Sequence, residues 1–237
     1  MGHGPTPVQR EPSEPTPAIQ WPLPPDPAPA AARRLRLGVM ASGSGSNFEA
    51  LVKACQQGHL PAEVSLLVVN NPGCGAQERA ARLGVPCVVH DHHLAASREA
   101  LDQALIESFQ AAGVDLVVMA GWMSIVTPVL LDAYPDKVIN LHPSLLPAFP
   151  GMRAVEQAVE YGVRVFGVTV HLVDNGVDTG AIILQRAIEL PEMSDPTEVH
   201  QILQGIEHEL LPEAVRLLAR GAVTRDPDNP RRLIVTP

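Results

Sequence analysis

The sequence has few cysteines, and their spacing excludes two common uses of this residue. Its three cysteines, Cys55, Cys74 and Cys87, form no C-x-x-C pair and are odd in number. A zinc knuckle or a disulfide framework requires cysteines paired at suitable spacings. The sequence therefore indicates a reducing environment, and we expect the protein to work in the cytoplasm.

Long apolar runs and an excess of positive charge are also missing. No hydrophobic run approaches the roughly 18 residues of a membrane-spanning helix, and the first residues lack the apolar region of a signal peptide. The chain carries 26 Asp and Glu against 17 Lys and Arg, a formal net charge of -9. Because cationic groups dominate nucleic-acid binding, we expect neither a nucleic acid nor a membrane as partner. A small anionic substrate is compatible with this charge, since backbone amides can hold it.

The composition predicts one main domain with two tails. The chain has 237 residues, of which 46% are hydrophobic, enough for one sizeable core. Residues 1–32 are dominated by Pro and Ala, a composition typical of a disordered or polyproline-type extension. We expect a domain over residues 33–221, with halves at 33–140 and 141–221, and a tail over 222–237. The stretch "RLIVT" in that tail could add an edge strand.

Strand-like and helix-like segments alternate through the main domain. Continuous apolar runs at 35–41, 64–69, 85–89, 115–120 and 138–141 are typical of strands covered on both faces. Helical periodicity separates them at 47–57, 75–83, 97–112 and 127–133. This order predicts an α/β fold, with a Rossmann-like, mostly parallel sheet flanked by helices. A further helix at 152–161, strands at 164–173 and 181–189, and a helix at 196–220 capped by Ser194 or Asp195 complete the pattern.

The first strand ends in the glycine-containing loop "ASGSGSNF" (41–48), and a helix follows. Small residues allow close approach of a ligand, and the unpaired amides of the helix's first turn attract an anion. The pattern matches neither the dinucleotide fingerprint nor a Walker loop, so we favour a phosphate monoester bound by Gly45, Ser46 and Asn47. The alternative is a tight turn in which Ser46 only caps the helix.

The stretch "VINLHPSLLPAFPG" (138–151) places Asn140 and His142 on the same side of a strand that ends at once in a proline-rich loop. An amide beside an imidazole suits acyl-type transfer, because the amide can hold an oxyanion while the imidazolium moves a proton. The alternative is a structural histidine before a rigid loop. The residues alone leave both interpretations open.

A carboxylate for this imidazole could come from "HLVDNGVDTG" (171–180), which contains Asp174 and Asp178. A carboxylate near an imidazole favours its protonated form, as a general acid requires. Asp174 could instead form only a turn with Asn175 and Gly176. On the preceding strand, Thr169 and His171 alternate with apolar residues and should share one polar face.

The stretch "HDHHL" (90–94) has the residue types of a metal site. His90 and His92 could face one way at strand spacing, but no carboxylate or cysteine partner is evident from the pattern. We therefore expect no metal ion here.

Together the stretches "ASGSGSN", "NLHPSLLPAFPG" and "HLVDNGVDTG" resemble, in order and spacing, the phosphoribosylglycinamide formyltransferase family, over about residues 35–220. The resemblance implies the formyltransferase fold, with a nucleotide-phosphate-binding half, a folate and catalytic half, and C-terminal antiparallel strands. It implies transfer of a formyl group from 10-formyltetrahydrofolate to the amine of 5′-phosphoribosylglycinamide in de novo purine biosynthesis. No metal is required, and the chain would be a monomer or homodimer whose partners are small molecules.

The resemblance also carries residue roles onto this chain. The catalytic residues would be Asn140, His142 and Asp178. The ribonucleotide would be bound by Gly45, Ser46, Asn47, Gln204, Gly205, Ile206 and Glu207. The folate would be bound by Arg98, Met123, Ser124, Ile125, Val126, Asn140, Asp174, Asn175, Gly176, Val177 and Asp178. Ser124 departs from the arginine of some members, which puts in doubt only a side-chain role at this position.

Three other functions fit the sequence less well. A methionyl-tRNA formyltransferase typically continues its proline loop with Arg-Gly-Ala-Ala and has a basic domain, whereas this loop reads "AFPGMRA" and the chain is acidic. A formyltetrahydrofolate deformylase usually has a regulatory domain in front, which 32 proline-rich residues cannot form. A binding module without catalysis would have no need of the intact trio Asn140, His142 and Asp178.

Overall fold

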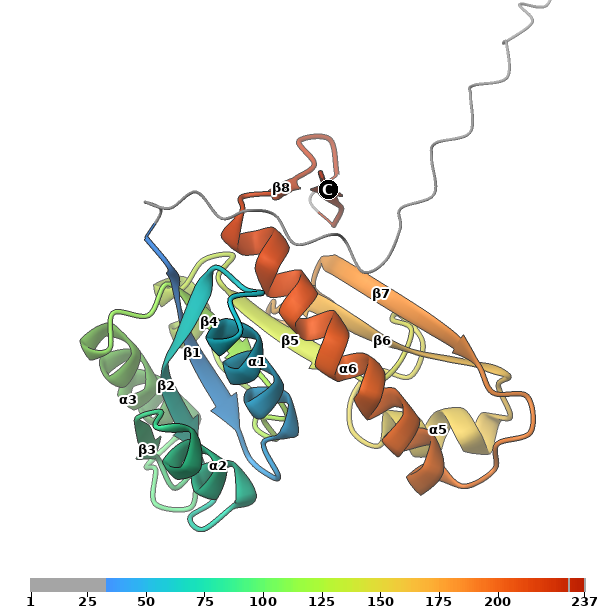
Figure 1. Ribbon diagram of the computed structural model, residues 1–237, viewed down its shortest axis with the longest axis horizontal. Coiled ribbons are helices and arrows are strands. Elements are labelled where there is room, and N and C mark those ends of the chain that lie inside the picture. Colours follow the sequence, from blue (N-terminus) through green and yellow to red (C-terminus); the bar gives the residue numbers. More distant parts are fainter. Residues whose placement is uncertain (1–32, 230, 237) are drawn as a thin grey trace, which may run out of the picture.

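The computed structural model describes residues 33–229 and 231–236, and Figure 1 shows their arrangement. The extension predicted for residues 1–32 lies outside the described residues. The main sheet has seven strands in the order β3-β2-β1-β4-β5-β6-β7. Among the described residues, no helix is long and apolar enough to cross a membrane.

The first five strands are parallel to one another, which confirms the predicted α/β pattern. These strands are β1 (Leu35–Ala41), β2 (Ala62–Val69), β3 (Cys87–Val89), β4 (Leu116–Met119) and β5 (Val138–His142). The helices between them are α1 (Ser46–Gln56), α2 (Gly75–Leu83), α3 (Arg98–Ala111) and α4 (Pro128–Ala133). Parallel strands all end at one edge, so the loops after β1, β2, β4 and β5 lie along that edge, where α/β proteins bind ligands.

The last two strands of the sheet are antiparallel additions, as the sequence predicts. They are β6 (Val165–Leu172) and β7 (Ile182–Glu189), and the helices around them are α5 (Ala154–Tyr161) and α6 (Pro196–Ala219). Asp195 caps α6 by accepting a hydrogen bond from the Thr197 amide. In the tail, β8 (Val223–Arg225) and β9 (Leu233–Val235) form a separate two-stranded sheet, so "RLIVT" pairs with β8 and not with the main sheet.

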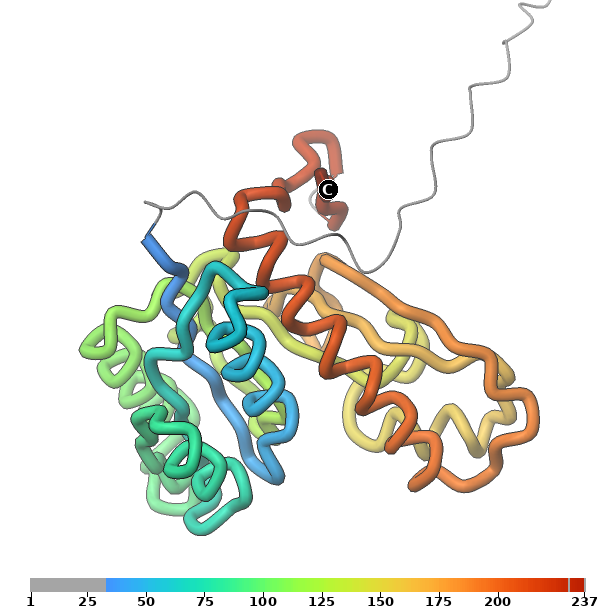
Figure 2. The backbone as a smooth tube through the Cα atoms, viewed as in Figure 1, coloured from blue at the N-terminus to red at the C-terminus, as the bar shows by residue number. Residues whose placement is uncertain are grey.

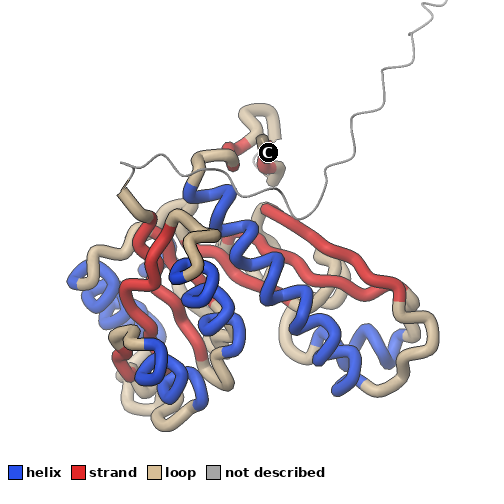
Figure 3. Tube along the Cα trace, viewed as in Figure 1, coloured by secondary structure: helices blue, strands red, loops and turns tan. Residues whose placement is uncertain are grey.

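Two apolar layers cover the sheet, one on each face. Helices α1 and α6 pack on one face, and Figures 1 and 3 show α6 crossing the strands beside α1. Phe109 and Leu105 of α3 and Leu130 of α4 belong to the layer on the other face. In Figure 2 the first half of the chain, blue to green, lies beside the second half, yellow to red, with β4 and β5 between them.

Alternation along β5 and β6 decides where their polar side chains point. Ile139 and Leu141 belong to the layer under α1 and α6, and Val138 belongs to the layer under α3 and α4. Asn140 and His142 therefore point to the α3 side, since alternate residues share a face. The same alternation along β6 puts Thr169 and His171 on that face, as predicted. Helices α5 and α6 pack on the opposite face, so they do not cover these polar side chains.

Candidate functional site

The loop between β1 and α1 is held open for an anion by backbone geometry. Gly45 is the N-cap residue of α1, with a left-handed φ of 74°, and no side chain caps this helix end. Ser46 accordingly does not cap α1, which removes that alternative. The free amides of the first turn point outward from the positive end of the helix dipole. The arrangement suits a phosphate group.

Neighbouring strands and helices fix this loop in place. The Ser42 hydroxyl accepts a hydrogen bond from the Met123 amide (2.9 Å), and the Ser42 carbonyl accepts one from Asn71 Nδ2 (2.7 Å). Arg79 Nε of α2 donates to the Ser44 carbonyl at 2.8 Å. Contacts from the loops after β2 and β4 and from α2 thus set the positions of the loop amides before any ligand binds.

Helix α6 carries four of the predicted ribonucleotide residues, and two of them form hydrogen bonds with the start of α1. Glu207, which is buried, accepts a 2.7 Å hydrogen bond from Asn47 Nδ2, and Gln204 Nε2 donates to Ser46 Oγ at 3.0 Å. Buried Asn47 Oδ1 has no hydrogen-bond partner among the described residues, so it is free to accept from a ligand hydroxyl. Gly205 is exposed and Ile206 packs against the core, so any role of these two remains a prediction.

Replacing Gly45 with alanine should damage both the fold and anion binding. A Cβ at Gly45 would lie 2.6 Å from Ala76 Cα and Cβ, and the left-handed backbone disfavours any side chain. We expect a loss of about 2 kcal/mol or more, which lowers the unfolding midpoint by roughly 4–8 °C. Weaker binding of a phosphate monoester should accompany it, measured by calorimetry.

Gly43→Ala is the matched control, because a Cβ at Gly43 meets no atom within 4 Å. It should leave the midpoint and the anion affinity near those of the unmodified protein. Equal behaviour of the two variants would contradict the role assigned to Gly45.

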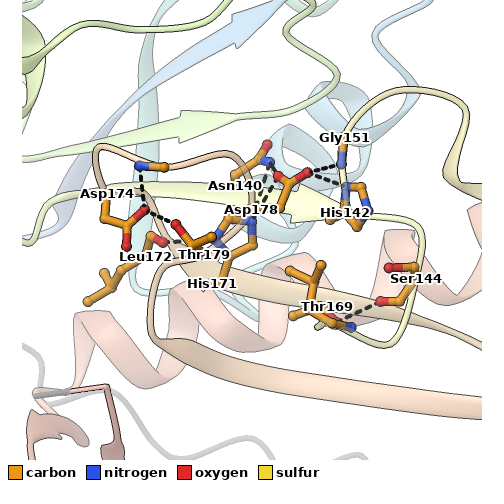
Figure 4. A network of polar contacts seen from close by, with 12 residues as sticks. Asn140, His142, Ser144, Gly151, Thr169, His171, Leu172, Asp174, Asp178 and Thr179 are labelled. Atoms are coloured by element: carbon orange, nitrogen blue, oxygen red, sulfur yellow. Dashed lines mark hydrogen bonds and ion pairs between the residues drawn. The ribbon is translucent and has the colours of Figure 1, made fainter. Parts of the chain in front are cut away.

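Asp178 lies at the centre of a second polar cluster, shown in Figure 4. Its Oδ2 accepts a hydrogen bond from the Gly151 amide at 2.7 Å and lies 3.3 Å from His142 Nδ1. Its Oδ1 accepts from Asn140 Nδ2 at 3.3 Å and lies 3.5 Å from His171 Nε2. The structure therefore brings the predicted trio of Asn140, His142 and Asp178 into direct contact.

The surroundings of Asp178 keep it ionised. Burial by itself would raise the pKa of this carboxyl group. The hydrogen bonds from His171 and Gly151 and the charges of His142 and His171 outweigh burial and lower the pKa from 3.8 to about 2. A fixed negative charge therefore faces both imidazoles at neutral pH.

The loop after β6 folds back over the strand to deliver Asp178. Asp174 Oδ1 accepts hydrogen bonds from the Gly176 amide at 3.0 Å and from Thr179 Oγ1 at 2.6 Å. Gly180 lies so close to Leu172 that an added Cβ would be 1.7 Å from the Leu172 carbonyl oxygen. Asp174 therefore stabilises a turn, which is one of the two roles that the sequence allowed for it. Its contact with a folate stays a prediction.

Three hydrogen bonds tie the proline-rich loop after β5 to the sheet, and two of them come from residues outside the predicted site, Thr169 and Gln185. His142 Nε2 donates to the Phe149 carbonyl at 2.8 Å, which assigns a proton to that nitrogen because a carbonyl oxygen only accepts. Thr169 Oγ1 donates to the Ser144 carbonyl at 2.7 Å. Gln185 Nε2 donates to the Leu146 carbonyl at 2.9 Å. The alternation along 164–173 indicated Thr169, whereas no pattern indicated Gln185.

His171 also lies beside the trio, although the sequence predicted only that it would lie on a polar face of its strand. It is 2% exposed, its Nδ1 donates to the Leu172 carbonyl at 2.8 Å, and its Nε2 faces Asp178 and the Asn140 amide. The predicted polar face of β6 was the available signal, and only the antiparallel pairing of Asn140 with His171 gives it meaning.

Apart from Asn140 on β5, the residues predicted to bind a folate lie on two loops and at one helix end. Met123 and Ile125 are 71% and 57% exposed on the loop after β4, where Ser124 and Val126 are half-buried. Val177 is 51% exposed on the loop after β6. Arg98 is exposed at the first residue of α3, whereas the trio comes from β5 and from the loop after β6.

The histidines of "HDHHL" do not pair as the strand spacing suggested. His90 Nε2 lies 2.8 Å from Ser108 Oγ of α3, and burial lowers the pKa of His90 despite the nearby charge of Glu107. His92 Nδ1 instead contacts the Asn70 carbonyl at 3.0 Å. The two rings therefore point to different partners.

Comparison with known proteins places the chain in a family. The model of the formyl transferase family matches residues 35–215. The phosphoribosylglycinamide formyltransferase of Bacillus subtilis (strain 168) is 42% identical over 183 residues, 77% of this chain and 94% of that protein. The trifunctional purine biosynthetic protein adenosine-3 of Drosophila melanogaster is 39% identical over 199 residues, 83% of this chain but 15% of that protein. A crystal structure of glycinamide ribonucleotide transformylase 1 from Symbiobacterium toebii superposes with a TM-score of 0.84 at 41% identity, covering 87% of this chain and 96% of that one. The chain therefore belongs to the formyl transferase family, and within it to the phosphoribosylglycinamide formyltransferases.

Proposed function

We propose that this protein transfers a formyl group from 10-formyltetrahydrofolate to the amine of 5′-phosphoribosylglycinamide, a step of de novo purine biosynthesis. The observation that carries the proposal is the convergence of Asn140, His142 and Asp178 beside a phosphate-type loop. The names of the relatives support the choice of acceptor.

The acceptor fits the contacts between α1 and α6. The amides at Gly45, Ser46 and Asn47 suit a phosphate monoester, because they neutralise it without a basic patch. Glu207 and the unpartnered Asn47 Oδ1 suit ribose hydroxyls or an amine, both of which donate hydrogen bonds. An acidic protein can therefore bind an anionic substrate here.

The donor fits the exposed apolar residues beside the trio. Met123, Ile125 and Val177 offer apolar side chains to a flat pterin ring, and backbone groups of their loops can pair with its polar edge. Arg98 supplies a positive charge suited to a carboxylate of the same ligand. The donor supplies an activated formyl group, so the proposed reaction requires no metal.

Asn140 and His142 act on the formyl oxygen and on the protons. The Asn140 amide donates to the oxygen as negative charge develops on it, and the imidazolium of His142 stabilises the same charge. The proton that His142 holds on Nε2, now donated to the Phe149 carbonyl, becomes available when a ligand oxygen or nitrogen replaces that carbonyl. Positioning of the amine against the formyl carbon provides a further large part of the rate.

Asp178 orients the imidazole and balances its charge. Its Oδ2 faces His142 Nδ1, so a carboxylate lies on the side of the ring opposite Nε2. Hydrogen bonds from Gly151 and Asn140 fix that carboxylate, which avoids reorganisation during the reaction.

An assay with alternative acceptors tests the proposed function directly. Purified protein with 10-formyltetrahydrofolate should change the folate absorbance only when 5′-phosphoribosylglycinamide is added. Folate consumption with water alone would indicate a deformylase, and turnover with methionyl-tRNA would indicate the tRNA enzyme. Either result without turnover of the ribonucleotide would refute the proposal.

We further propose that the protein works in the cytoplasm on small molecules, as a monomer or homodimer. The support is its kinship with biosynthetic enzymes and its three cysteines, all of them free thiols. Sedimentation at several protein concentrations would distinguish the two assembly states.

A further inference from the structure

The turn after β3 brings together three side chains of types that ligate metal ions. One ligand atom from each of Asp91, His92 and His93 lies within 4.8 Å of the other two. Within the described part of the chain, no other group of three or more such residues meets this geometry. None of the three belongs to the proposed catalytic or substrate-binding residues.

Backbone hydrogen bonds explain why three consecutive side chains gather on one side. The His93 amide donates to Asp91 Oδ1 at 2.9 Å, and the Leu94 amide donates to the Asp91 carbonyl at 3.1 Å. This Asp-initiated turn folds the carboxylate back over the following residues. The rings of His92 and His93 lie with their centroids 3.9 Å apart at an angle of 38°.

A hydrogen bond from His92 to the end of β2 prepares this ring as a ligand. Its Nδ1 lies 3.0 Å from the carbonyl oxygen of Asn70, a residue that is 2% exposed. Because a carbonyl oxygen only accepts, the proton sits on Nδ1 and leaves a lone pair on Nε2. Metal-binding histidines usually donate their second ring nitrogen to a carbonyl or carboxylate in this way. The buried partner also fixes the ring orientation.

We propose that Asp91, His92 and His93 form a zinc-binding site. Two imidazoles and one carboxylate are a ligand set that zinc accepts, with water in the fourth position. Ligands of a tetrahedral zinc ion lie roughly 3.4 Å apart, so the trio must contract by on the order of 1 Å. His93 is exposed and can make that adjustment, while Asp91 and His92 are half-buried and more firmly held.

The neighbouring His90 lies outside the site. Its Nε2 is engaged with Ser108 of α3, whereas the three ligands gather around the turn. The proposal departs from the expectation of no metal ion at this stretch, and its ligands differ from the pair of His90 and His92 considered there. It lies in the connection between β3 and α3, and an ion bound there would fix the segment that leads to the α3 cap at Ser97.

Zinc affinity of the full chain, measured by competition with a chromophoric chelator, tests the proposal. We expect one zinc ion per chain. His92→Asn and His93→Asn should each weaken zinc binding about a hundredfold or more. Loss of a residue that only hydrogen-bonds to a metal ligand costs up to about a hundredfold, and loss of the ligand itself should cost at least as much. Asp91→Asn should also weaken binding, although its amide oxygen can still accept from the His93 amide and keep the turn. His200→Asn, on the exposed side of α6, is the control and should leave the affinity unchanged.

Two further measurements distinguish zinc binding by these three residues from zinc binding by other side chains. The three variants should keep the circular dichroism and the formyl-transfer rate of the unmodified protein, because none of their side chains takes part in the proposed reaction. The cobalt-substituted protein should lack a thiolate charge-transfer band. Absence of zinc binding, unchanged affinity in the His92 and His93 variants, or a thiolate band assigned to Cys74 and Cys87 would overturn the proposal.

Discussion

His142→Ala is expected to lower kcat by about a hundredfold to ten-thousandfold, the contribution of a positioned acid or base. The ring removed is the one that holds a proton on Nε2 and faces Asp178 through Nδ1. Alanine leaves Asn140 and the phosphate loop in place, so KM for the ribonucleotide should change much less than kcat. Steady-state kinetics with both substrates varied will measure the two constants.

His200→Ala is the control for this variant, because His200 is an exposed histidine of α6 that is not among the predicted site residues. Its kinetic constants should match those of the unmodified protein. A His142→Ala variant that folds normally and turns over at a near-normal rate would eliminate the proton-transfer role. His142 would then be the structural histidine that the sequence left as an alternative.

Asp178→Asn is expected to lower kcat by on the order of a thousandfold or more, because a carboxylate that orients a catalytic imidazole contributes about that much. The amide has the same shape and can still accept from the Gly151 amide, so the loop should keep its course. The negative charge that faces His142 and His171 is lost, so it no longer balances an imidazolium formed during the reaction. The loss should therefore appear in kcat/KM as well as in kcat.

The stability of the same variant should depend on pH in a defined direction. The pKa of Asp178 falls from 3.8 to about 2 on folding, so its ionisation stabilises the fold above pH 3.8. This contribution, about 2 kcal/mol, is lost as the pH falls through about 2. Denaturant unfolding should show a gap between unmodified protein and variant that shrinks between pH 4 and pH 2. A gap that stays constant over that range would contradict the assigned ionisation.

Much of the fold could be predicted because the signals are local. Continuous apolar runs placed β1, β2 and β4 within two residues of their observed bounds, since strands buried on both faces need such runs. The α6 cap was narrowed to Ser194 or Asp195 from their side chains, and the structure shows that Asp195 is the cap. The pairing of "RLIVT" was not, because a three-residue strand carries no information about which neighbour it joins.

The same distinction between local and long-range signals applies to the candidate site residues. Gly45, Asn140 and His142 could be found because glycine at a strand end and polar residues two apart on an apolar strand are visible in one short stretch. His171 and Gln185 could not be assigned, since their roles depend on strand pairing and on contacts with distant loops. His90 and His92 could face one way only if strand spacing applied to them, and their rings have different partners because they lie in the turn after β3.

The sequence by itself determined the alternating α/β order, and it singled out the glycine loop after the first strand and the three residues proposed as the catalytic trio. Only the tertiary structure decided that Asp178, from a loop that starts at the far end of β6, meets His142 and Asn140, and that Glu207 of α6 meets Asn47 of α1. The physical reason is the distance along the chain over which each effect acts. Apolar periodicity and glycine conformation act within a few residues, whereas strand pairing and helix packing join groups separated by as many as 160 positions.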